Sequence, residues 1–290
     1  MELRVLKYFL TVAEKESITK AAESLYITQP TLSRQLIDLE EEVGKKLFIR
    51  GKKIILTEEG LLLRKRAEEI FSLVDKTTME ISNSDDIING DIHIGTGDSN
   101  LISPILRKAK KLQDDYPNIK YHFYSGNLDF IMEKLDNGLI DFGVIFGDLN
   151  KEKYNFIEFD EKETLGIITS KNSNLAKVEQ ISLKHLNDEP IIISSQVITN
   201  SFFIKLFEDN KISPKITSTY NLLYTAAILA KEKLGISLGF NPFFDKTEDE
   251  LLIFKPLNPK VEIQMYLIWK KEQIFSRASQ KFLDAMKKNY

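Results

Sequence analysis

Arginine is concentrated near the start of this chain of 290 residues. Five of its seven arginines lie within residues 1–66, and the other two are Arg107 and Arg277. The planar guanidinium group binds phosphates and guanine edges through two parallel hydrogen bonds, which a lysine ammonium does not do. The distribution of arginine therefore indicates DNA as a binding partner of the first segment.

The net charge of the whole chain conceals this asymmetry. With 40 basic and 43 acidic residues, the formal charge is −3, which would ordinarily argue against a nucleic-acid partner. Residues 1–66, however, hold 13 lysines and arginines against 10 acids, so this segment carries +3 and the remainder −6. The sequence thus predicts a basic head on an acidic body.

Polar side chains crowd the first half of a helix predicted over residues 28–43. Thr28 is a suitable N-cap, and Pro30 is tolerated in the first turn because an N–H would have no partner there. Acids gather at the far end, at 40–42. This polarity suits a helix whose front half meets phosphates and bases. The front half carries Gln29, Thr31, Ser33, Arg34 and Gln35, and the buried stripe consists of Leu32, Leu36, Leu39 and Val43.

Two shorter helices and a hairpin must position that helix. The apolar spacing predicts helices over residues 3–14 and 18–25. Gly44 ends the polar helix, and residues 45–57 then form a two-stranded hairpin. The turn of the hairpin, Arg50-Gly51-Lys52-Lys53, makes it a wing with a basic tip.

A long helix is predicted from Thr57 to about Ser82. About 25 residues make a rod of about 37 Å, which is too long for a connector in a small domain. Apolar or small residues recur in steps of four and three with one larger step, so we interpret the rod as a dimerisation helix. The alternative is a helix that packs in a bundle within one subunit. The recurring residues are Leu63, Ala67, Ile70, Val74 and Ile81.

The character of the sequence changes after a polar linker at 83–89. Strands and helices alternate from there, which predicts parallel sheets with right-handed crossovers. The first unit has strands at 92–95, 119–124 and 142–146 and helices at 101–115 and 128–137. The second has strands at 165–169, 191–194, 216–219 and 235–240 and helices at 202–209 and 222–231. A strand at 263–269 and a helix at 276–288 close the chain.

The sequence lacks the residues that several kinds of catalytic, metal-binding and nucleotide-binding site require. The chain has no cysteine, which excludes disulfides, thiolate metal ligands and cysteine nucleophiles. His93, His122 and His185 stand isolated, without an H-E-x-x-H or G-x-S-x-G motif, so neither a zinc site nor a hydrolase is indicated and we expect structural histidines. A phosphate-binding loop motif is also missing. We therefore expect no catalytic residues, no metal site and no cofactor.

The composition is that of a globular protein, with 42% hydrophobic and 29% charged residues. The first residues lack the basic and apolar regions of a signal peptide, and no run of about 18 apolar residues occurs. We expect a soluble cytoplasmic protein without a membrane partner.

Residues 17–48 resemble the winged helix-turn-helix of LysR-type transcriptional regulators, and a looser resemblance covers nearly the whole chain. The residues that follow the family pattern are Ala21, Ala22, Leu25, Gln29, Pro30, Ser33, Arg34, Leu39, Glu40, Gly44, Leu47, Phe48, Arg50, Leu56, Thr57 and Gly60. The resemblance implies the α/β fold class, with an N-terminal winged helix-turn-helix, a long linker helix and a two-lobed effector-binding domain similar to periplasmic solute-binding proteins. The implied domains are residues 1–58 for DNA binding, 59–89 for the linker helix and 90–290 for the effector, with lobe I at 90–160 and 261–290 and lobe II at 161–260.

In this interpretation the polar helix enters the major groove and the wing contacts the minor groove or the backbone. The predicted DNA-binding residues are Thr28, Gln29, Pro30, Thr31, Ser33, Arg34, Arg50, Lys52 and Lys53. Among them Gln29, Ser33 and Arg34 reach base edges and phosphates, and the threonines help to fix the register. Lys45 and Lys46 could equally be a solvated pair.

The resemblance also implies a small-molecule effector bound between the lobes, and helix N-termini there favour a polar or anionic metabolite. Ligands of open α/β sheets bind beyond the carboxyl ends of the strands, where helix N-termini offer free N–H groups. The implied effector-binding residues are Asp98, Ser99, Asn100, Ser125, Gly126, Asn127, Ser194, Ser195, Thr199 and Asn221. We rank Ser99 first, because many family members have Ser or Thr there. Each of these residues could instead be a helix cap, and Phe202 and Phe203 could line a pocket or simply pack.

These features together predict a sequence-specific regulator of transcription that binds double-stranded promoter DNA and is controlled by a small molecule. Because a helix-turn-helix half-site is short, specific binding requires two DNA-binding domains. The resemblance implies a homotetramer built as a dimer of dimers, with RNA polymerase as a further partner. The alternative from another class is a two-lobed solute-binding protein, or a small-molecule enzyme, with an incidental helical domain at its start.

Overall fold

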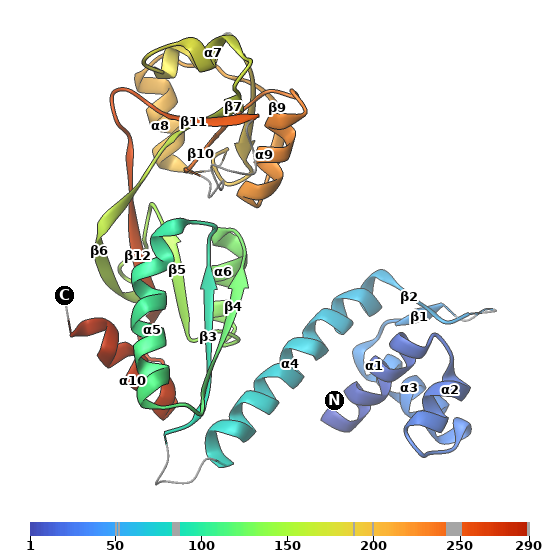
Figure 1. Ribbon diagram of the computed structural model, residues 1–290. Coiled ribbons are helices and arrows are strands. Elements are labelled where there is room, and N and C mark those ends of the chain that lie inside the picture. The colour runs from blue at the N-terminus through green and yellow to red at the C-terminus, as the bar shows by residue number, and fades with distance from the viewer. Residues whose placement is uncertain are drawn as a thin grey trace. The chain divides into compact units, whose positions relative to one another are not determined.

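The computed structural model describes residues 1–49, 51, 53–82, 88–187, 189–198, 200–241 and 251–288 (Figure 1). The chain divides into two units, Met1–Ser82 and Asn83–Tyr290. The first contains a helical head and the long helix, and the second contains two α/β lobes. Within the described ranges, none of the helices is both long enough and apolar enough to cross a membrane.

Three helices pack around one apolar centre in the head. They are α1 (Leu3–Lys15), α2 (Ile18–Ser24) and α3 (Gln29–Val43). Ser17 caps α2 by accepting the N–H of Lys20. Gly44 ends α3 with a φ of 68°, a left-handed conformation that glycine adopts without strain. The buried side chains of this centre are Phe9, Val12, Ala21, Ala22, Leu32, Leu36, Leu39, Leu47 and Phe48.

A hairpin and the long helix complete the first unit. They consist of β1 (Phe48–Ile49), β2 (Ile55–Leu56) and α4 (Glu58–Ser82). The two strands are antiparallel, so the predicted wing is confirmed. The Thr57 hydroxyl caps α4 by accepting the N–H of Gly60 at 3.0 Å. A Cβ atom on Gly60 would lie 2.2 Å from the carbonyl oxygen of Leu47, so this close approach of α4 to the wing requires glycine.

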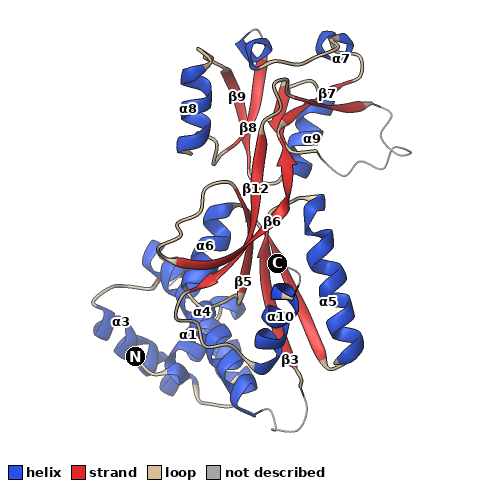
Figure 2. Cartoon of the chain, turned by 90° about the vertical axis from the view of Figure 1, so that its left-hand side faces the viewer, coloured by secondary structure: helices blue, strands red, loops and turns tan. Residues whose placement is uncertain are grey.

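Lobe I is a five-stranded sheet with helices on both faces (Figure 2). Its elements are β3 (Gly90–Thr96), η1 (Asn100–Ile102), α5 (Ser103–Asp115), β4 (Ile119–Ser125), α6 (Leu128–Asp136), β5 (Phe142–Phe146), β6 (Tyr154–Thr164), β12 (Glu262–Lys270) and α10 (Arg277–Lys287). The strand order is β4-β3-β5-β12-β6, and the first three strands are parallel. Helices α5 and α10 pack on one face, and α6 packs on the other.

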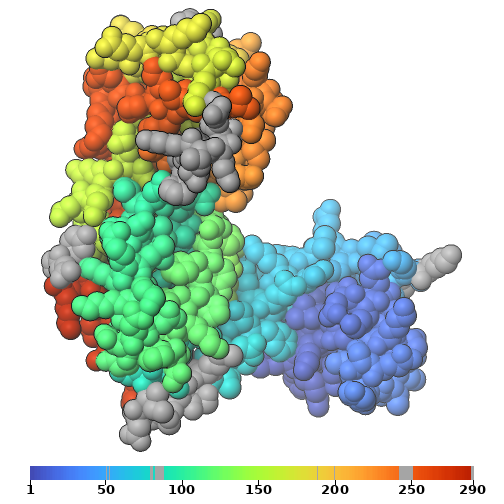
Figure 3. Space-filling model, viewed as in Figure 1, coloured from blue at the N-terminus to red at the C-terminus, as the bar shows by residue number. Residues whose placement is uncertain are grey.

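Lobe II is a second five-stranded sheet. Its elements are β7 (Gly166–Ser170), α7 (Asn174–Lys177), η2 (Leu183–Asn187), β8 (Pro190–Ser194), α8 (Ser201–Asp209), β9 (Lys215–Tyr220), α9 (Leu223–Lys231), β10 (Ile236–Gly239) and β11 (Leu252–Pro256). The strand order is β11-β7-β10-β8-β9. Helix α8 packs on one face and α9 on the other. In the space-filling view, lobe II lies directly above lobe I (Figure 3).

Two features of the sheets differ from the sequence-based expectation. Both sheets are mixed, because β12 and β6 in lobe I and β7 and β11 in lobe II run antiparallel to their neighbours. Strands β6 and β11 were not predicted at all. The second half of β6 is rich in charged residues, which obscures the alternation of a half-buried strand. The expected lobe boundary at residue 160 falls inside β6, which pairs with β12 as far as Thr164.

Candidate functional site

The front half of α3 presents its polar side chains to solvent. Thr28, Gln29, Pro30, Thr31 and Arg34 are exposed, and Ser33 is half-buried. The Thr28 hydroxyl accepts the N–H of Thr31, and the two hydroxyl oxygens lie 2.8 Å apart. These contacts begin the helix in a defined conformation, so that Gln29 and Arg34 project from a fixed backbone.

The wing is tied to the end of α1 through Glu16. Lys53 Nζ lies 2.6 Å from the Glu16 carboxylate, and the N–H of Ile54 donates to the Glu16 carbonyl at 3.1 Å. The hydrogen bond and the charge of Lys53 lower the pKa of Glu16, and the same pairing raises the pKa of Lys53. The other predicted wing contacts, Arg50 and Lys52, lie outside the described residues.

A buried carboxylate organises the start of the wing. Glu40 is 3% exposed and accepts hydrogen bonds from the N–H of Leu47 at 2.8 Å, the N–H of Phe48 at 3.2 Å and Lys46 Nζ at 2.9 Å. Burial raises the pKa of Glu40, but these hydrogen bonds outweigh it, so the pKa lies below 4.5. Lys45 lies 3.6 Å from an acid in the first turn of α4. Lys45 and Lys46 thus each face an acidic partner within the head.

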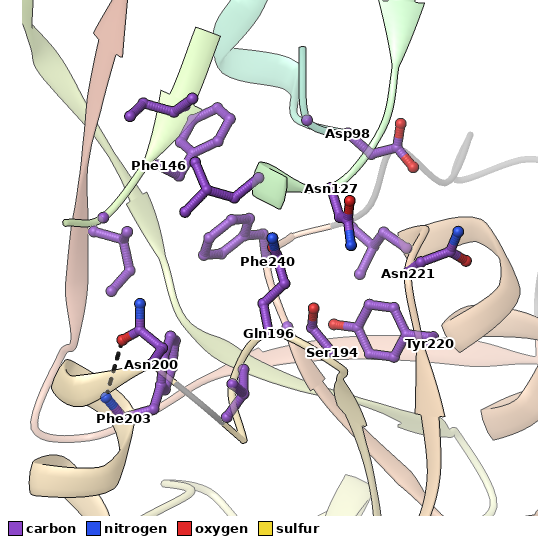
Figure 4. Close-up of a pocket in the computed structure, with 18 of the residues that line it drawn as sticks. Asp98, Asn127, Phe146, Ser194, Gln196, Asn200, Phe203, Tyr220, Asn221 and Phe240 are labelled. Carbon is purple, nitrogen blue, oxygen red and sulfur yellow. Dashed lines mark hydrogen bonds between the residues drawn. The ribbon is translucent and has the colours of Figure 1, made fainter. Parts of the chain in front are cut away.

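A pocket of about 150 Å³ lies between the lobes, beyond the carboxyl ends of β3 and β8 (Figure 4). Its walls are mainly apolar and include the rings of Phe146, Phe202, Phe203 and Phe240. Both phenylalanines whose role the sequence left open therefore line it. Its polar side chains are Asp98, Asn127, Ser194, Gln196, Asn200, Tyr220 and Asn221. Among the described lining residues there is no lysine, arginine or histidine.

The structure brings together half of the effector residues implied by the resemblance. Asp98, Gly126, Asn127, Ser194 and Asn221 line the pocket. Ser99, Asn100, Ser125 and Ser195 are not among the lining residues, and Thr199 lies outside the described residues. Asn127 also caps α6, because its side-chain oxygen accepts the N–H of Phe130 at 3.0 Å. Asn127 therefore both caps α6 and lines the pocket.

Ser99, the first-ranked residue, contacts a strand and not the pocket. Its hydroxyl donates to the carboxylate of Glu163 on β6, and its oxygen accepts the N–H of Leu101 at 3.0 Å. Glu163 is 5% exposed, and burial raises its pKa although the hydrogen bond from Ser99 acts in the opposite direction. A role for Ser99 in the effector response thus remains a prediction, now acting through Glu163.

Gln196 reaches across the cleft from the turn after β8. With its amide oxygen toward α6, it accepts the N–H groups of Leu128 at 2.6 Å and Asp129 at 3.1 Å. Two other contacts between the lobes join the Ser201 hydroxyl to Asp148 at 3.2 Å and the rings of Phe146 and Phe240, whose centroids lie 5.6 Å apart. The side chains around the pocket therefore also hold the lobes together.

Most of the apolar wall and Gln196 were not predicted from the sequence. Phe146 and Tyr220 are the last residues of β5 and β9, and Phe240 directly follows β10. The rule that ligands bind beyond the carboxyl ends of strands applies to these positions as well as to the polar ones that we selected. No spacing signal points to Gln196, because its partner is the backbone of a helix in the other lobe.

Two of the three histidines are not isolated. His93 and His122 are register partners on β3 and β4, and their rings stack with centroids 4.7 Å apart and 14° between the planes. Asp91 Oδ2 lies 3.3 Å from His122 Nε2. The expectation of isolated histidines is wrong for this pair, because the parallel register places residues distant in sequence side by side. His185 keeps a structural role, since its Nδ1 accepts the N–H of Ser182 at 3.0 Å.

Two sequence families match the two units of the chain. Residues 3–61 match the family described as "Bacterial regulatory helix-turn-helix protein, lysR family". Residues 87–290 match "LysR substrate binding domain". The chain belongs to the LysR family. The predicted family and fold class are thereby confirmed, and this LysR-family chain is a DNA-binding transcriptional regulator with an effector-binding domain.

Named relatives agree with the LysR assignment. The HTH-type transcriptional regulator BsdA of Bacillus subtilis is 31% identical over 163 residues, which are 56% of this chain and 56% of BsdA, so that match spans about half of each. The HTH-type transcriptional regulator BenM of Acinetobacter baylyi is 31% identical over 249 residues, or 82% of this chain and 80% of BenM. The crystal structure of full-length CbnR complexed with its target DNA has the same fold, with a TM-score of 0.75 at 20% identity over 98% of both chains.

Proposed function

We propose that this LysR-family regulator reads its operator with the front half of α3 and changes activity when a small molecule binds between its lobes. The exposed polar side chains at the start of α3, beside a wing, carry the first part of the proposal. The structure of CbnR on its target DNA supports it. The pocket between the lobes of the effector-binding domain supports the second part.

Within the head we assign distinct roles to helix and wing. The amide of Gln29 suits adenine, the guanidinium of Arg34 suits guanine or phosphate, and Ser33 can reach either. The residues that set the register at the start of α3 are Thr28, Pro30 and Thr31. The wing residues that contact the minor groove or backbone are Arg50, Lys52 and Lys53. Lys53 exchanges its ion pair with Glu16 for phosphate when DNA binds.

Binding of the full chain to its own upstream DNA, compared with random duplex across salt concentrations, tests this assignment. We expect Arg34→Ala to weaken specific binding by about tenfold or more, because loss of a bidentate base contact costs about 1–3 kcal/mol. Arg107→Ala removes the same charge from an exposed position on α5 and serves as the control. Equal affinity for random duplex, or unchanged binding by Arg34→Ala, would overturn the proposal.

The pocket favours a small ligand with an apolar body and few charges. Its volume is similar to that of cavities that hold benzene, and phenylalanine rings form much of the wall. The N–H groups of Leu128, Asp129 and Phe130, which begin α6, already donate to Gln196 and Asn127, and the carboxylate of Asp98 repels negative charge. Because no basic side chain occurs among the described lining residues, we narrow the predicted polar or anionic metabolite to one with at most one negative group.

A thermal-shift screen tests the ligand class. The screen compares ring-sized carboxylates, amides and amines with metabolites of the enzymes encoded beside this gene. We expect a monocarboxylate or amide to raise the melting temperature, and Asn221→Ala to reduce that rise. Asn172→Ala, at an exposed position of the same lobe, is the control. A preference for dianions, or an equal shift in the Asn221→Ala variant, would overturn this assignment.

We propose that α4 joins subunits into dimers, and that two dimers form the tetramer. Leu63, the first residue of the predicted stripe, packs partly buried against the core of the head, and Ala67 is fully buried. Other apolar residues of the helix are exposed, among them Leu61, Leu62, Leu73 and Ile81. These exposed apolar side chains support the packing of α4 against a helix of a second subunit. Light scattering of the full chain tests this assembly, and we expect the mass of a tetramer. The proposal also includes a cytoplasmic location and contact with RNA polymerase.

A further inference from the structure

Lobe I carries a cluster of two histidines and an aspartate that the effector pocket does not use. His93 and His122 are register partners, and Asp91 lies two residues before His93 on the same face of β3. One ligand atom from each of the three residues lies within 4.8 Å of the others. We propose that Asp91, His93 and His122 bind a divalent transition-metal ion of the zinc, cobalt or nickel class, for which imidazole and carboxylate are suitable ligands.

The spacing of two of these ligands already fits a metal ion. Asp91 Oδ2 and His122 Nε2 are 3.3 Å apart. Two ligands of a tetrahedral zinc ion, each about 2.0–2.1 Å from the metal, are separated by about 3.4 Å. His122 Nε2 is buried and makes no hydrogen bond of acceptable geometry within the described part of the chain. A metal ion between the two groups would satisfy both.

His93 is held in a manner that suits the third ligand. Its Nδ1 lies 3.0 Å from the hydroxyl of Tyr124. Metal-binding imidazoles usually engage their second nitrogen in such a hydrogen bond, which orients the ring and selects the tautomer. Nε2 of His93 is therefore the ligand atom. Because the two rings are stacked, binding requires the His122 ring to tilt, and its side chain is 43% exposed, which leaves it room to do so.

The charges around the cluster favour a cation. Asp141 is 2% exposed and accepts the N–H of His93 at 2.8 Å. Lys134 Nζ, 5.2 Å from the centroid of the Tyr124 ring, supplies one opposing charge.

The proposed metal site is separate from the effector pocket. Asp91 lies near the amino end of β3, whereas the pocket begins at Gly97, beyond its carboxyl end. Six residues of extended strand span about 20 Å. Figure 1 shows β3 and β4 side by side with their carboxyl ends toward lobe II. An ion at Asp91 would thus cross-link the far ends of these two strands without contacting the effector.

Titration of the full chain, without an affinity tag, with cobalt(II) chloride tests the proposal. We expect one equivalent to bind, to give the visible absorption of cobalt with nitrogen and oxygen ligands, and to raise the melting temperature of the chain. Zinc chloride should displace the cobalt, and magnesium chloride should not, because magnesium prefers oxygen ligands.

Single substitutions identify the ligands. His93→Gln and His122→Gln should each weaken cobalt binding at least tenfold, and Asp91→Asn should also weaken it. His185→Gln, the third histidine, is the matched control and should bind as the wild type does. Circular dichroism of each variant checks that it is folded. Failure to bind millimolar cobalt, or binding that His93→Gln and His122→Gln leave unchanged, would overturn the proposal.

Discussion

The hydroxyl of Ser99 donates a hydrogen bond to the carboxylate of Glu163, which joins the turn after β3 to the end of β6. Glu163 is 5% exposed and is the register partner of Ile263 on β12. Ile263 lines the pocket between the lobes. Ser99 of lobe I therefore holds β6, the strand that leads into lobe II, at a point next to the wall of the pocket. This arrangement gives Ser99 a route to the effector response without direct contact.

Glu163→Gln tests the burial of this carboxylate. Burial raises the pKa of Glu163 above its ordinary value of 4.5, so the folded pKa exceeds the unfolded one. The wild-type chain therefore loses stability as the pH rises from 4.5 through the folded pKa, and Glu163→Gln does not. We expect the variant to be more stable at neutral pH, by about 1 kcal/mol, and the difference to shrink below pH 4.5. Urea unfolding followed by Trp269 fluorescence measures this, and parallel pH profiles would contradict it.

Ser99→Ala should destabilise lobe I. The substitution removes a donor from a buried carboxylate, and an unsatisfied buried group costs about 1–3 kcal/mol. Trp269, the single tryptophan, lies on β12 of this lobe and reports its unfolding. Ser195→Ala, at an exposed position, is the control and should change the free energy of unfolding by less than about 0.5 kcal/mol. We also expect Ser99→Ala to weaken the effector response while DNA affinity stays unchanged; loss of DNA binding would count against this role.

Glu40→Ala should destabilise the head by about 2–4 kcal/mol, because Glu40 is buried and accepts three hydrogen bonds. Its folded pKa lies below 4.5, so its contribution is present above that pH and is lost as the pH falls through the folded pKa. The difference between wild type and variant should therefore shrink in acid. Urea unfolding followed by circular dichroism checks both effects. Glu41→Ala, one residue along and exposed, should have little effect, and equal losses in the two variants would refute the prediction.

Gln196→Leu should loosen the contact between the lobes. The variant leaves the N–H groups of Leu128 and Asp129 without their acceptor, so their hydrogen exchange should accelerate. Gln196→Glu keeps an acceptor and adds a negative charge at a helix N-terminus, so protection should be retained. Exchange measured by mass spectrometry or NMR separates the two variants. If both variants exchange as the wild type does, the bridge is absent in solution.

Secondary structure in the head and in much of the lobes followed from local signals. The helix predicted over 28–43 begins after Thr28 and ends at Gly44 in the structure, because its cap and its left-handed end depend only on neighbours in the sequence. The strand predicted at 142–146 corresponds to β5. Strand β6 escaped detection, because its position at the sheet edge tolerates the charged side chains that a central strand would exclude.

The family, the order of most elements and the polar front half of α3 could be predicted from the sequence, since periodicity and capping act between residues close in the chain. The contacts between side chains distant in the sequence became known from the three-dimensional fold. Strand register brings His93 to His122, the course of β6 brings Glu163 to Ser99, and docking of the lobes brings Gln196 to the start of α6. These contacts depend on long-range strand pairing and packing, in which the position of each strand is set by all the others. No local sequence pattern encodes such contacts.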